Sequence, residues 1–533
     1  MTDEEIPATG GGVPLNLGDL PSRWIGTGRT AFVDLTGDPA AGPGAVSYDD
    51  LADRCARIGG WLGQQGYGRG ARIGILADNS VDYAACYLGI MRAGMAAVPL
   101  NTRQPTAVQA DVAADAALAL VFHDADHAHL LPPGVPAVRF GPSPERRPTG
   151  GRPGWDQVLG ARPGAAVDMH PDEVAVQMYT SGSTGRPKGV LLTHGGQLFS
   201  IHQYVTGVLP MEPDERLLVS APMYHKNAGM QLKMALSLGG TVILLRRFTP
   251  DGYLRAVAAH RATAVSGVPT MFALMAGRPE LVAELDLSGV RRASIGSAPM
   301  TQALFDQARR LFPHATVTNG YGTTEVVAVF GGHPEGRARP DISVGHPLAA
   351  VGTRLVDPAT GADAEPDPAT GRRRGELWVR SPGLMTGYHN RAELTAERVT
   401  DGWYHTGDVM EADADGWHFV VGRVDDMFNC GGENVYPGDV EQMLERCPLV
   451  HQAGVVAVPD DVKGALPVAF VVAAPGEAPT EDEVKAWALA NGPAYQHPRA
   501  VWMVDELPLA STAKLDKAAL AAEAARRWVP RPG

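Results

Sequence analysis

Short apolar runs rich in β-branched residues alternate along this chain with stretches rich in Ala and Leu, and this alternation restricts the folds open to it. The apolar runs include 72–77 (RIGILA), 175–179 (AVQMY), 216–221 (RLLVSA) and 241–245 (TVILL). Strands that alternate with helices are typical of layered α/β proteins, whereas all-β folds and helix bundles lack this pattern. We therefore expect an α/β fold.

The length of the chain and a restart of its pattern near the C-terminal end predict two domains. With 533 residues the chain exceeds the size of one ordinary core. Residues 130–164, rich in Pro, Gly and Arg, are expected to cross the surface as a loop. After Asp425 a new set of elements begins, with a glycine-containing loop, a helix and strands. We predict a large N-terminal domain of layered sheets and helices over residues 1–424 and a small, mobile α+β C-terminal domain over residues 426–533.

Composition and charge disfavour several classes of protein and partner. The formal net charge of −13 gives no generic attraction to nucleic acid or to an anionic membrane. The most membrane-like run, 83–100, contains Arg92 and two glycines, which favours a buried helix followed by a strand. The chain opens with acidic residues and no basic n-region, which disfavours a secretory leader. Four scattered cysteines without a CxxC pair fit a reduced compartment, so we expect a soluble cytoplasmic protein: Cys55, Cys86, Cys430 and Cys447.

The stretch 179–190, YTSGSTGRPKGV, is a candidate phosphate-binding loop between two apolar strands. Its small residues let the backbone close around phosphate oxygens, while hydroxyls, amides and an ammonium supply donors. A P-loop has Gly-Lys followed by Ser or Thr and leads into a helix, whereas here Lys188 follows Pro187 and a strand comes next. A glycine-rich surface hairpin is the alternative interpretation. The candidate phosphate ligands are Thr180, Ser181, Gly182, Ser183, Thr184, Gly185 and Lys188.

Four further motifs follow in a fixed order, and together with this loop they resemble those of a known superfamily. They are 319–325 (NGYGTTE), 404–408 (YHTGD), 422–437 (GRVDDMFNCGGENVYP) and 508–516 (PLASTAKLD). The chain resembles the adenylate-forming enzymes, which comprise acyl- and aryl-CoA ligases, carrier-protein-loading adenylation domains and luciferases. It is most similar in appearance to CoA ligases of the benzoate or chlorobenzoate kind. This resemblance implies an ATP-dependent carboxylic acid–CoA ligase that forms an acyl-adenylate and then a CoA thioester, with a bulky or aromatic acid as substrate.

The resemblance implies ATP, Mg²⁺ and coenzyme A as reactants or cofactors, and it assigns roles to the matching residues. Lys514 is implied to be the catalytic lysine that approaches the carboxylate and the α-phosphate, although Ala513 stands where glycine commonly precedes it. Thr324 is implied to donate to the α-phosphate. Glu325 and Thr184 are implied to bind Mg²⁺, a hard cation that takes oxygen ligands. The implied ATP/AMP-binding set adds to the loop residues Ser297, Ala298, Pro299, Asn319, Gly320, Tyr321, Gly322, Thr323, Thr324, Asp408, Arg423 and Lys514.

The same resemblance implies an acyl pocket, a path for CoA and a hinge. His225 matches the catalytic position that gates the carboxylate, and no Asp near it could pair with an ammonium group, which disfavours an amino acid as substrate. Lys226 either pairs with a polar or second anionic substrate group or points to solvent. Asp425 matches the position about which the small domain pivots. The implied pocket consists of His225, Lys226, Asn227, Gly229, Gly267, Gly296, Tyr321 and Gly322, and the implied CoA tunnel consists of Gly431, Gly432 and His225.

Two other functions stay open at this point. One is a freestanding adenylation enzyme that loads an acyl group onto a carrier-protein phosphopantetheine. The other is a non-catalytic nucleotide-binding protein, which the joint presence of Lys514, Glu325, Asp408 and Arg423 disfavours. A group of histidines and aspartates at 123–129 has the residue types of a metal site without its ligand spacing, so a polar loop is favoured there. The residues leave the identity of the acid open, and also whether the chain forms a homodimer.

Overall fold

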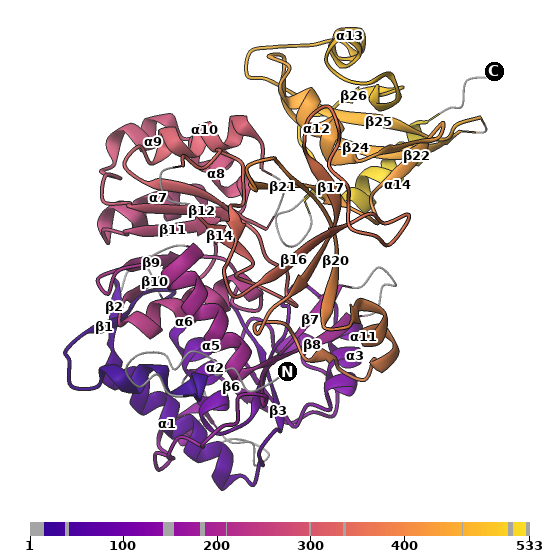
Figure 1. The fold of residues 1–533 in the computed structure, drawn as a ribbon. Coiled ribbons are helices and arrows are strands. Elements are labelled where there is room, and N and C mark those ends of the chain that lie inside the picture. The colour runs from indigo at the N-terminus through magenta and orange to yellow at the C-terminus, as the bar shows by residue number, and fades with distance from the viewer. Residues whose placement is uncertain are drawn as a thin grey trace.

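The computed structural model confirms the α/β class and the large N-terminal body with a smaller C-terminal part (Figure 1). The C-terminal elements, coloured orange to yellow, lie together at one end of the molecule. Within the described residues no helix has the length and apolar character needed to cross a bilayer. The structure describes residues 15–37, 42–141, 154–181, 187–208, 211–297, 300–333, 337–460, 462–509 and 515–528.

The first large sheet carries the candidate phosphate loop. Its strand order is β18-β8-β7-β4-β3-β5-β6, and its central pairs from β7 through β6 are parallel. β7 and β8 pair in antiparallel fashion, with Ser181 opposite Pro187, so these two strands flank the candidate loop. The strands are β3 (Arg72–Leu76), β4 (Ala96–Pro99), β5 (Leu120–His123), β6 (Ala137–Arg139), β7 (Val174–Ser181), β8 (Pro187–Thr193) and β18 (Gly387–Tyr388).

The second large sheet has the order β13-β12-β11-β9-β10-β1-β2 and is parallel except for its pairing with the edge strand β2. Apolar β-branched side chains occupy both faces of its central strands, as expected for a parallel sheet covered by helices on both sides. The strands are β1 (Thr30–Leu35), β2 (Gly44–Ser47), β9 (Arg216–Val219), β10 (Thr241–Leu245), β11 (Ala264–Gly267), β12 (Arg292–Gly296) and β13 (Thr316–Gly320).

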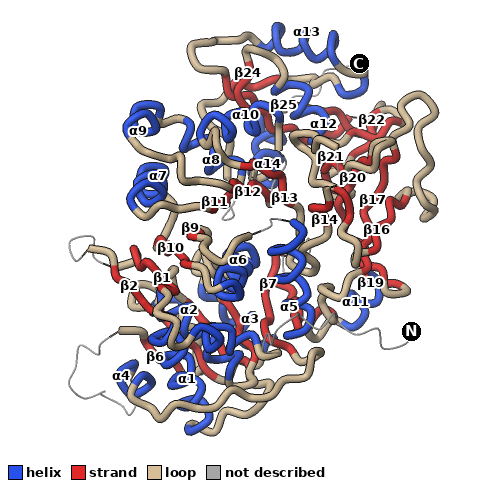
Figure 2. Tube along the Cα trace, turned by 60° about the vertical axis from the view of Figure 1, so that its left-hand side comes forward, coloured by secondary structure: helices blue, strands red, loops and turns tan. Residues whose placement is uncertain are grey.

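Helices cover these sheets and complete three apolar clusters. α2 is almost entirely buried, in agreement with the expectation of a buried helix rather than a membrane span. α7 and α8 lie beside β11 and β12 (Figure 2) and share one core with them. The helices are α1 (Tyr48–Gln64), α2 (Val81–Arg92), α3 (Thr106–Ala116), α4 (Trp155–Leu159), α5 (His194–Gln203), α6 (Lys226–Leu238), α7 (Pro250–Ala259), α8 (Pro269–Ala276), α9 (Pro279–Glu284) and α10 (Gln302–Leu311), with short turns η1 (Leu17–Trp24), η3 (Ala128–Leu130) and η4 (Tyr204–Val208).

The expectation of one continuous loop over 130–164 was wrong in part. β6 adds to the edge of the first sheet beside β5, and α4 packs against that edge. Trp155 is buried and meets the Phe122 and Phe140 rings edge-on, at centroid distances of 6.0 and 5.0 Å. Trp155 and Phe140 thus anchor a segment whose richness in Pro and Gly indicates a loop.

A third, antiparallel sheet links the N-terminal body to the C-terminal part. Its order is β16-β17-β20-β19, and β21 pairs with β20. The segment 357–372 between β16 and β17 is exposed along most of its length and turns back on itself, as a hairpin connection does. The elements are β14 (Phe330–Gly332), β15 (His346–Pro347), β16 (Gly352–Val356), β17 (Arg373–Arg380), α11 (Ala392–Arg398), β19 (Val399–Thr400), β20 (Trp403–Ala412) and β21 (His418–Arg423).

The C-terminal part has its own sheet and its own apolar core. β24 and β25 form a long antiparallel hairpin, and Val455, Val468 and Phe470 on it are buried with α12 and α14. The domain boundary near Asp425 and the role of Asp425 as a hinge remain predictions. The elements are β22 (Phe428–Cys430), β23 (Glu433–Val435), α12 (Pro437–Glu445), β24 (Val450–Asp460), β25 (Gly464–Ala473), α13 (Glu481–Asn491), η5 (Ala494–Gln496), β26 (Val501–Met503) and α14 (Lys517–Arg527).

Candidate active site

Lys188, at the start of β8, lies above the Tyr388 ring of β18, the strand that pairs with β8. The distance from its ammonium nitrogen to the ring centroid is 5.5 Å, so the aromatic face can hold the cation in place. Thr180 faces Lys188 across the β7–β8 ladder. The rest of the predicted loop, Gly182, Ser183, Thr184 and Gly185, lies outside the described residues, as does the side chain of Ser181.

Glu325 is a buried carboxylate, 9% exposed, and it contacts Tyr388 of β18. The Tyr388 hydroxyl donates to Glu325 Oε1 at 2.8 Å, and it is itself hydrogen-bonded to the Tyr404 hydroxyl. Burial, and then the Glu325 carboxylate, raise the pKa of Tyr388, so its hydroxyl stays protonated and remains a donor. Sequence reasoning missed Tyr388, whose only signal is a tyrosine after glycine between two motifs.

Asp408 brings three of the sequence motifs together. Tyr321 donates its hydroxyl to Asp408 Oδ2 at 2.6 Å, and Arg423 Nη1 lies 2.6 Å from Oδ1. Asp408 and Arg423 are direct cross-strand partners on β20 and β21, a position where opposite charges stabilise a pair. Burial, and then Asp408, raise the pKa of Tyr321 well above its ordinary value. The structure thus joins Tyr321, Asp408 and Arg423, three members of the implied ATP/AMP-binding set, and their binding of nucleotide stays a prediction.

A local irregularity in β20 turns Asp408 towards this cluster. The β17–β20 ladder shifts register between Glu376 and Trp378, so β20 carries extra residues there. Gly407 sits in this bulge with φ of +72°, a left-handed conformation that glycine adopts without strain. Its N–H donates to Glu376 Oε1 at 2.9 Å. The glycine between Thr406 and Asp408 therefore allows the backbone conformation that directs the Asp408 carboxylate towards Tyr321 and Arg423.

The carboxyl ends of β12 and β13 form a narrow shelf. Gly296 pairs with Gly320 across the ladder, and Ser297 follows with φ of +67°, an uncommon conformation for a residue with a side chain. The Asn319 amide donates to the Ile342 carbonyl oxygen at 2.7 Å, so its side chain braces the following segment. Thr323, Thr324 and Gly322 lie in the turn after β13, while Ala298 and Pro299 are outside the described residues.

Gly296→Ala is expected to lower the free energy of unfolding by about 1–3 kcal/mol, because overpacking forces the backbone to shift. A Cβ atom at this position would lie 2.6 Å from the Gly320 carbonyl oxygen, which the neighbouring strand holds in place. Urea unfolding measures the change. Gly63→Ala, inside α1 with nothing within 4 Å of its added methyl, is the matched control and should stabilise by about 0.5–1 kcal/mol. An unchanged midpoint for Gly296→Ala would contradict the shelf packing.

The implied acyl wall begins where α6 starts. His225 is the N-cap residue of α6, and its ring packs against Tyr224 with centroids 4.6 Å apart. Lys226 does not point to solvent: its ammonium donates to Gln197 Oε1 at 3.0 Å. Asn227 accepts a hydrogen bond from Gln231, which fixes its amide. Gly229 and Gly267 lie beside side chains, Tyr87 for the first and Met271 for the second.

Two of the three residues implied to line the CoA tunnel lie in an exposed turn. Gly431 and Gly432 are the two central residues of the β22–β23 hairpin, with φ of +64° and +96°, as a two-residue turn of this kind requires. Cys430 beside them is buried in the C-terminal core, which fits a structural thiol. Asp425 is exposed and lies 3.5 Å from Arg423. Lys514 is outside the described residues, so the CoA tunnel, the hinge and the catalytic lysine stay predictions.

The histidines and aspartates at 123–129 form a polar network. His127 Nδ1 lies 2.7 Å from Asp124 Oδ1, and Arg246 pairs with Asp78 at 3.1 Å. Across the part of the chain that the structure describes, no group of three His, Cys, Asp or Glu side chains is arranged to hold a metal ion. The arrangement agrees with a polar loop, with Arg246 as its balancing charge.

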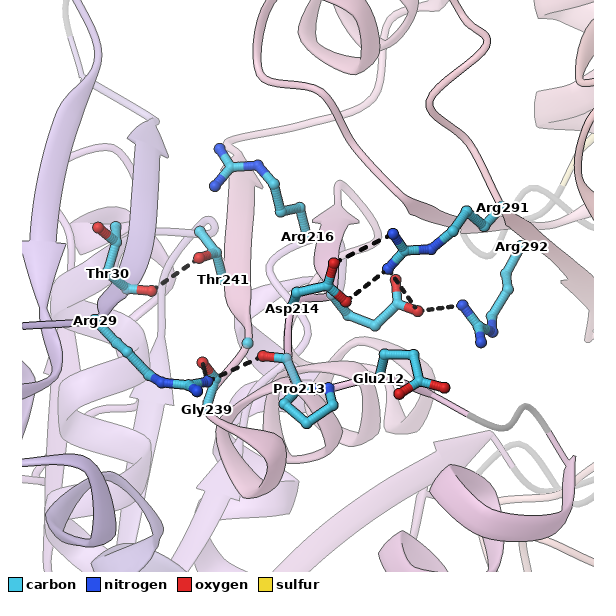
Figure 3. A pocket seen from close by; sticks show the side chains of 12 residues that line it. Arg29, Thr30, Glu212, Pro213, Asp214, Arg216, Gly239, Thr241, Arg291 and Arg292 are labelled. Carbon is cyan, nitrogen blue, oxygen red and sulfur yellow. Dashed lines mark hydrogen bonds and ion pairs between the residues drawn. The ribbon is translucent and has the colours of Figure 1, made fainter. Parts of the chain in front are cut away.

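A cavity of about 840 Å³ lies at the amino ends of β9, β10 and β12 (Figure 3). Ligand sites in open parallel sheets form at the carboxyl ends of the strands, so this cavity is at the edge opposite Gly296 and Gly320. Its charges largely neutralise one another, because Arg291 pairs with Asp214 at 2.8 Å and Arg292 pairs with the buried Glu215. We therefore place the candidate active site at the motif cluster and not here.

Comparisons with known proteins identify the same family as the sequence motifs. The model of the AMP-binding enzyme family matches residues 26–389, and that of the AMP-binding enzyme C-terminal domain matches residues 439–514. Feruloyl-CoA synthase from Amycolatopsis sp is 36% identical over 478 residues, which span 89% of this chain and 93% of that protein. 3-Hydroxybenzoate–CoA ligase from Aromatoleum sp. (strain CIB) is 31% identical over 496 residues, 91% of this chain and 93% of that protein.

Solved structures of related proteins have the same overall fold. ATP-bound MatB from Rhodopseudomonas palustris aligns with a TM-score of 0.84 at 27% identity, covering 96% of this chain and 99% of that one. The amide bond synthetase McbA from Marinactinospora thermotolerans aligns with a TM-score of 0.82 at 28% identity, with 96% and 99% covered. The resemblance first drawn from five motifs is confirmed, and this chain belongs to the family of AMP-binding enzymes.

Proposed function

We propose that this protein is an AMP-forming ligase that joins an aromatic carboxylic acid to coenzyme A through an acyl-adenylate. The observation that carries the proposal is the convergence of motif residues from separate parts of the chain on two adjoining clusters, Tyr321–Asp408–Arg423 and Lys188–Tyr388–Glu325. Relatives named feruloyl-CoA synthase and 3-hydroxybenzoate–CoA ligase, each matched along most of its length, support an aromatic acid and CoA.

In the first half-reaction a carboxylate oxygen attacks the α-phosphorus of ATP, the bond to the β-phosphate bridging oxygen breaks, and pyrophosphate leaves. Two anions must meet, so catalysis depends on neutralising charge and on holding the groups in line. Lys188 and the glycine-rich loop bind the β- and γ-phosphates, and Thr324 donates to the α-phosphate. Asp408 accepts from the vicinal ribose hydroxyls. Lys514 brings a cation to the carboxylate and the α-phosphate.

Glu325 fits a Mg²⁺ site of the kind that nucleotide enzymes use. Mg²⁺ is bound by one or two carboxylates together with substrate phosphates and water, so a cage of several protein ligands is not required. Tyr388 engages Glu325 Oε1, which leaves the other oxygen of this acceptor-only group for a cation. When bound, Mg²⁺ supplies positive charge that offsets charge on the phosphates. Thr184 is the second residue that we propose for this site.

In the second half-reaction the CoA thiol sulfur attacks the acyl carbonyl carbon, the bond to the adenylate oxygen breaks, and AMP leaves. We propose that His225 gates the carbonyl, and that Gly431 and Gly432 line the pantetheine path after the C-terminal domain turns about Asp425. Loading of a carrier-protein phosphopantetheine uses the same chemistry with a different thiol. We favour free CoA because the relatives named above are CoA ligases and synthases.

The test of this function is acid-dependent exchange of radiolabelled pyrophosphate into ATP, measured first without CoA. We expect exchange that requires an aromatic acid, followed on addition of CoA by net formation of AMP rather than ADP. Exchange without thioester in the presence of CoA would move the proposal to a carrier-protein acceptor. Absence of exchange with every acid of an aryl and fatty panel would contradict adenylate formation.

Glu325→Gln is expected to raise the Mg²⁺ concentration that half-saturates pyrophosphate exchange by about tenfold or more, because charge-assisted contacts are roughly twice as strong as neutral ones. The amide keeps the size of the side chain and an oxygen that accepts from Tyr388. Glu280→Gln, on the exposed first turn of α9, is the matched control. A Mg²⁺ titration that is the same for both variants would remove Glu325 from the proposed metal site.

A further inference from the structure

Two lysines of α6 share one hydrogen-bond acceptor directly behind the proposed acyl gate. Lys233 Nζ donates to Gln197 Oε1 at 2.8 Å, and Lys226 Nζ donates to the same oxygen at 3.0 Å. Lys233 and Gln197 are each 1% exposed, whereas Lys226 is half-buried. Lys226 directly follows His225, so the cluster adjoins the residue proposed to gate the carboxylate of the acid. We call Lys226, Lys233 and Gln197 the lysine subsite.

The geometry of α6 places both ammonium groups on one side of the helix. Lys226, Gly229 and Lys233 are spaced by three and four residues, which puts them on one face. That face meets Tyr87 of α2, because Lys233 Nζ lies 3.4 Å from the Tyr87 hydroxyl. A Cβ atom added at Gly229 would lie 3.5 Å from the same hydroxyl. Gly229 therefore places no side chain between the two lysines on this face.

The lysine subsite has more donors than acceptors. Each ammonium carries three N–H donors, yet within the described residues no carboxylate lies within ion-pair distance of Lys226 or Lys233. The Gln197 Nε2 group is buried and has no hydrogen-bond partner there. An unsatisfied buried donor is destabilising, so native proteins rarely keep one without a reason. An acceptor, preferably one with negative charge, would satisfy these donors.

The pKa shifts of the two lysines agree with the shortage of acceptors in the lysine subsite. Burial lowers the pKa of Lys233 to about 7. Burial, and then the neighbouring Lys233 ammonium, lower the pKa of Lys226 well below its ordinary value, with Glu325 acting in the opposite direction. Two cations held close in a desolvated place repel each other, and an anion between them would relieve that repulsion. A cationic substituent would meet the opposite effect and be rejected.

We propose that the lysine subsite binds a second, anionic oxygen substituent of the acid that the enzyme activates. This inference rests on the proposed function, because it names the class of acid. Lys226 Nζ and Gln197 Nε2 contact the substituent, and Lys233 is a positioning residue that holds Gln197 by its oxygen. Two substituents have this chemistry, a second carboxylate and a phenol that ionises on binding between cations. The activated carboxylate remains at the nucleotide.

The test compares acids that differ only in this substituent. Cinnamate is set against its 3- and 4-hydroxy, methoxy and carboxy derivatives, and kcat/KM for pyrophosphate exchange is measured with each. We expect at least one hydroxy or carboxy isomer to exceed cinnamate by about tenfold or more, as hydrogen bonds to charged groups allow, while the methoxy isomer does not. A preference for the carboxy isomer identifies a dicarboxylic acid, and a preference for the hydroxy isomer identifies a phenolic acid.

Lys226→Met and Lys233→Met test the residues, because methionine keeps the length of the side chain and removes its charge. We expect each to bring the ratio of kcat/KM between substituted and plain acid close to one, mainly through KM, and Lys226→Arg to retain the preference better than Lys226→Met. Lys485→Met, on α13 with an ion pair to Glu481, is the matched control. A merely structural role for the lysines lowers both acids equally and leaves the ratio unchanged, which would overturn the proposal.

Binding in the absence of ATP separates this inference from the proposed function. Calorimetric titration of the wild-type protein and of Lys226→Met with the same acids gives dissociation constants without turnover. If no acid yields a CoA thioester but the substituted acid binds about tenfold tighter to the wild type than to Lys226→Met, the lysine subsite stands and the proposed function fails. If thioesters form and substituted and plain acids bind equally to both proteins, the lysine subsite is wrong and the proposed function stands.

Discussion

Asp408→Ala is expected to reduce kcat/KM for ATP in pyrophosphate exchange by about 10²–10³-fold, because hydrogen bonds to a charged group contribute about 1.5–3 kcal/mol each. The substitution removes the carboxylate proposed to accept from both ribose hydroxyls. It also leaves Tyr321 and Arg423 without the oxygen atoms they contact at 2.6 Å. The loss should appear with every acid substrate, since it concerns the nucleotide.

The matched control for this result is Asp363→Ala, which breaks an aspartate–arginine pair on the exposed β16–β17 connection. Asp363 lies 2.7 Å from Arg354, and its side chain is 68% exposed. Exposed pairs contribute about 0–1 kcal/mol to stability, so this variant should behave like the wild type. An Asp408→Ala protein that exchanges pyrophosphate with unchanged kcat/KM for ATP would exclude the proposed ribose contact.

Lys514→Ala is expected to abolish adenylate formation, with a loss of about 10³-fold or more, while thioester formation from supplied acyl-adenylate continues. The reason is that its ammonium offsets charge only where the carboxylate meets the α-phosphate. Quenched-flow measurement of each half-reaction separates the two. Equal losses in both would contradict the assignment of Lys514 to the first half-reaction.

The neighbouring Lys517 is not a suitable control for Lys514, because it has a structural role. Lys517 is close in sequence, but its ammonium contacts the buried Glu441 and donates to the Val455 carbonyl oxygen at 3.0 Å. Its removal would leave a buried carboxylate without its cation, which is strongly destabilising. Lys485→Ala is the better control, because Lys485 pairs with Glu481, whose side chain is 45% exposed, so no buried carboxylate loses its cation.

The presence of strands around the candidate site could be predicted from the sequence, because apolar β-branched runs mark them, whereas their order in the sheets could not. Buried β-branched runs became β3, β7, β9 and β10, and the glycine-rich stretch separates β7 from β8 along the chain. The direction of the Asp408 carboxylate depends on Gly407 before it, because glycine adopts the left-handed backbone conformation found there.

The contacts that the sequence could not predict depend on tertiary structure alone. Tyr388 reaches Glu325 because β18 pairs with β8, although the two residues are 63 positions apart. Gln197 and Lys233 meet because α5 packs against α6, and neither belongs to a motif. Whether Lys226 faced substrate or solvent was open for the same reason: the partner that turns it inwards lies on another helix.

Mass spectrometry of a reaction that contains ATP, Mg²⁺, an aromatic acid and both possible acceptors, CoA and a phosphopantetheinylated carrier protein, tests the central claim most directly. The account predicts stoichiometric acyl-CoA and AMP with the carrier protein left unloaded. Acyl-carrier protein without acyl-CoA would contradict the proposed acceptor, and formation of ADP or of neither thioester would contradict the proposed reaction itself.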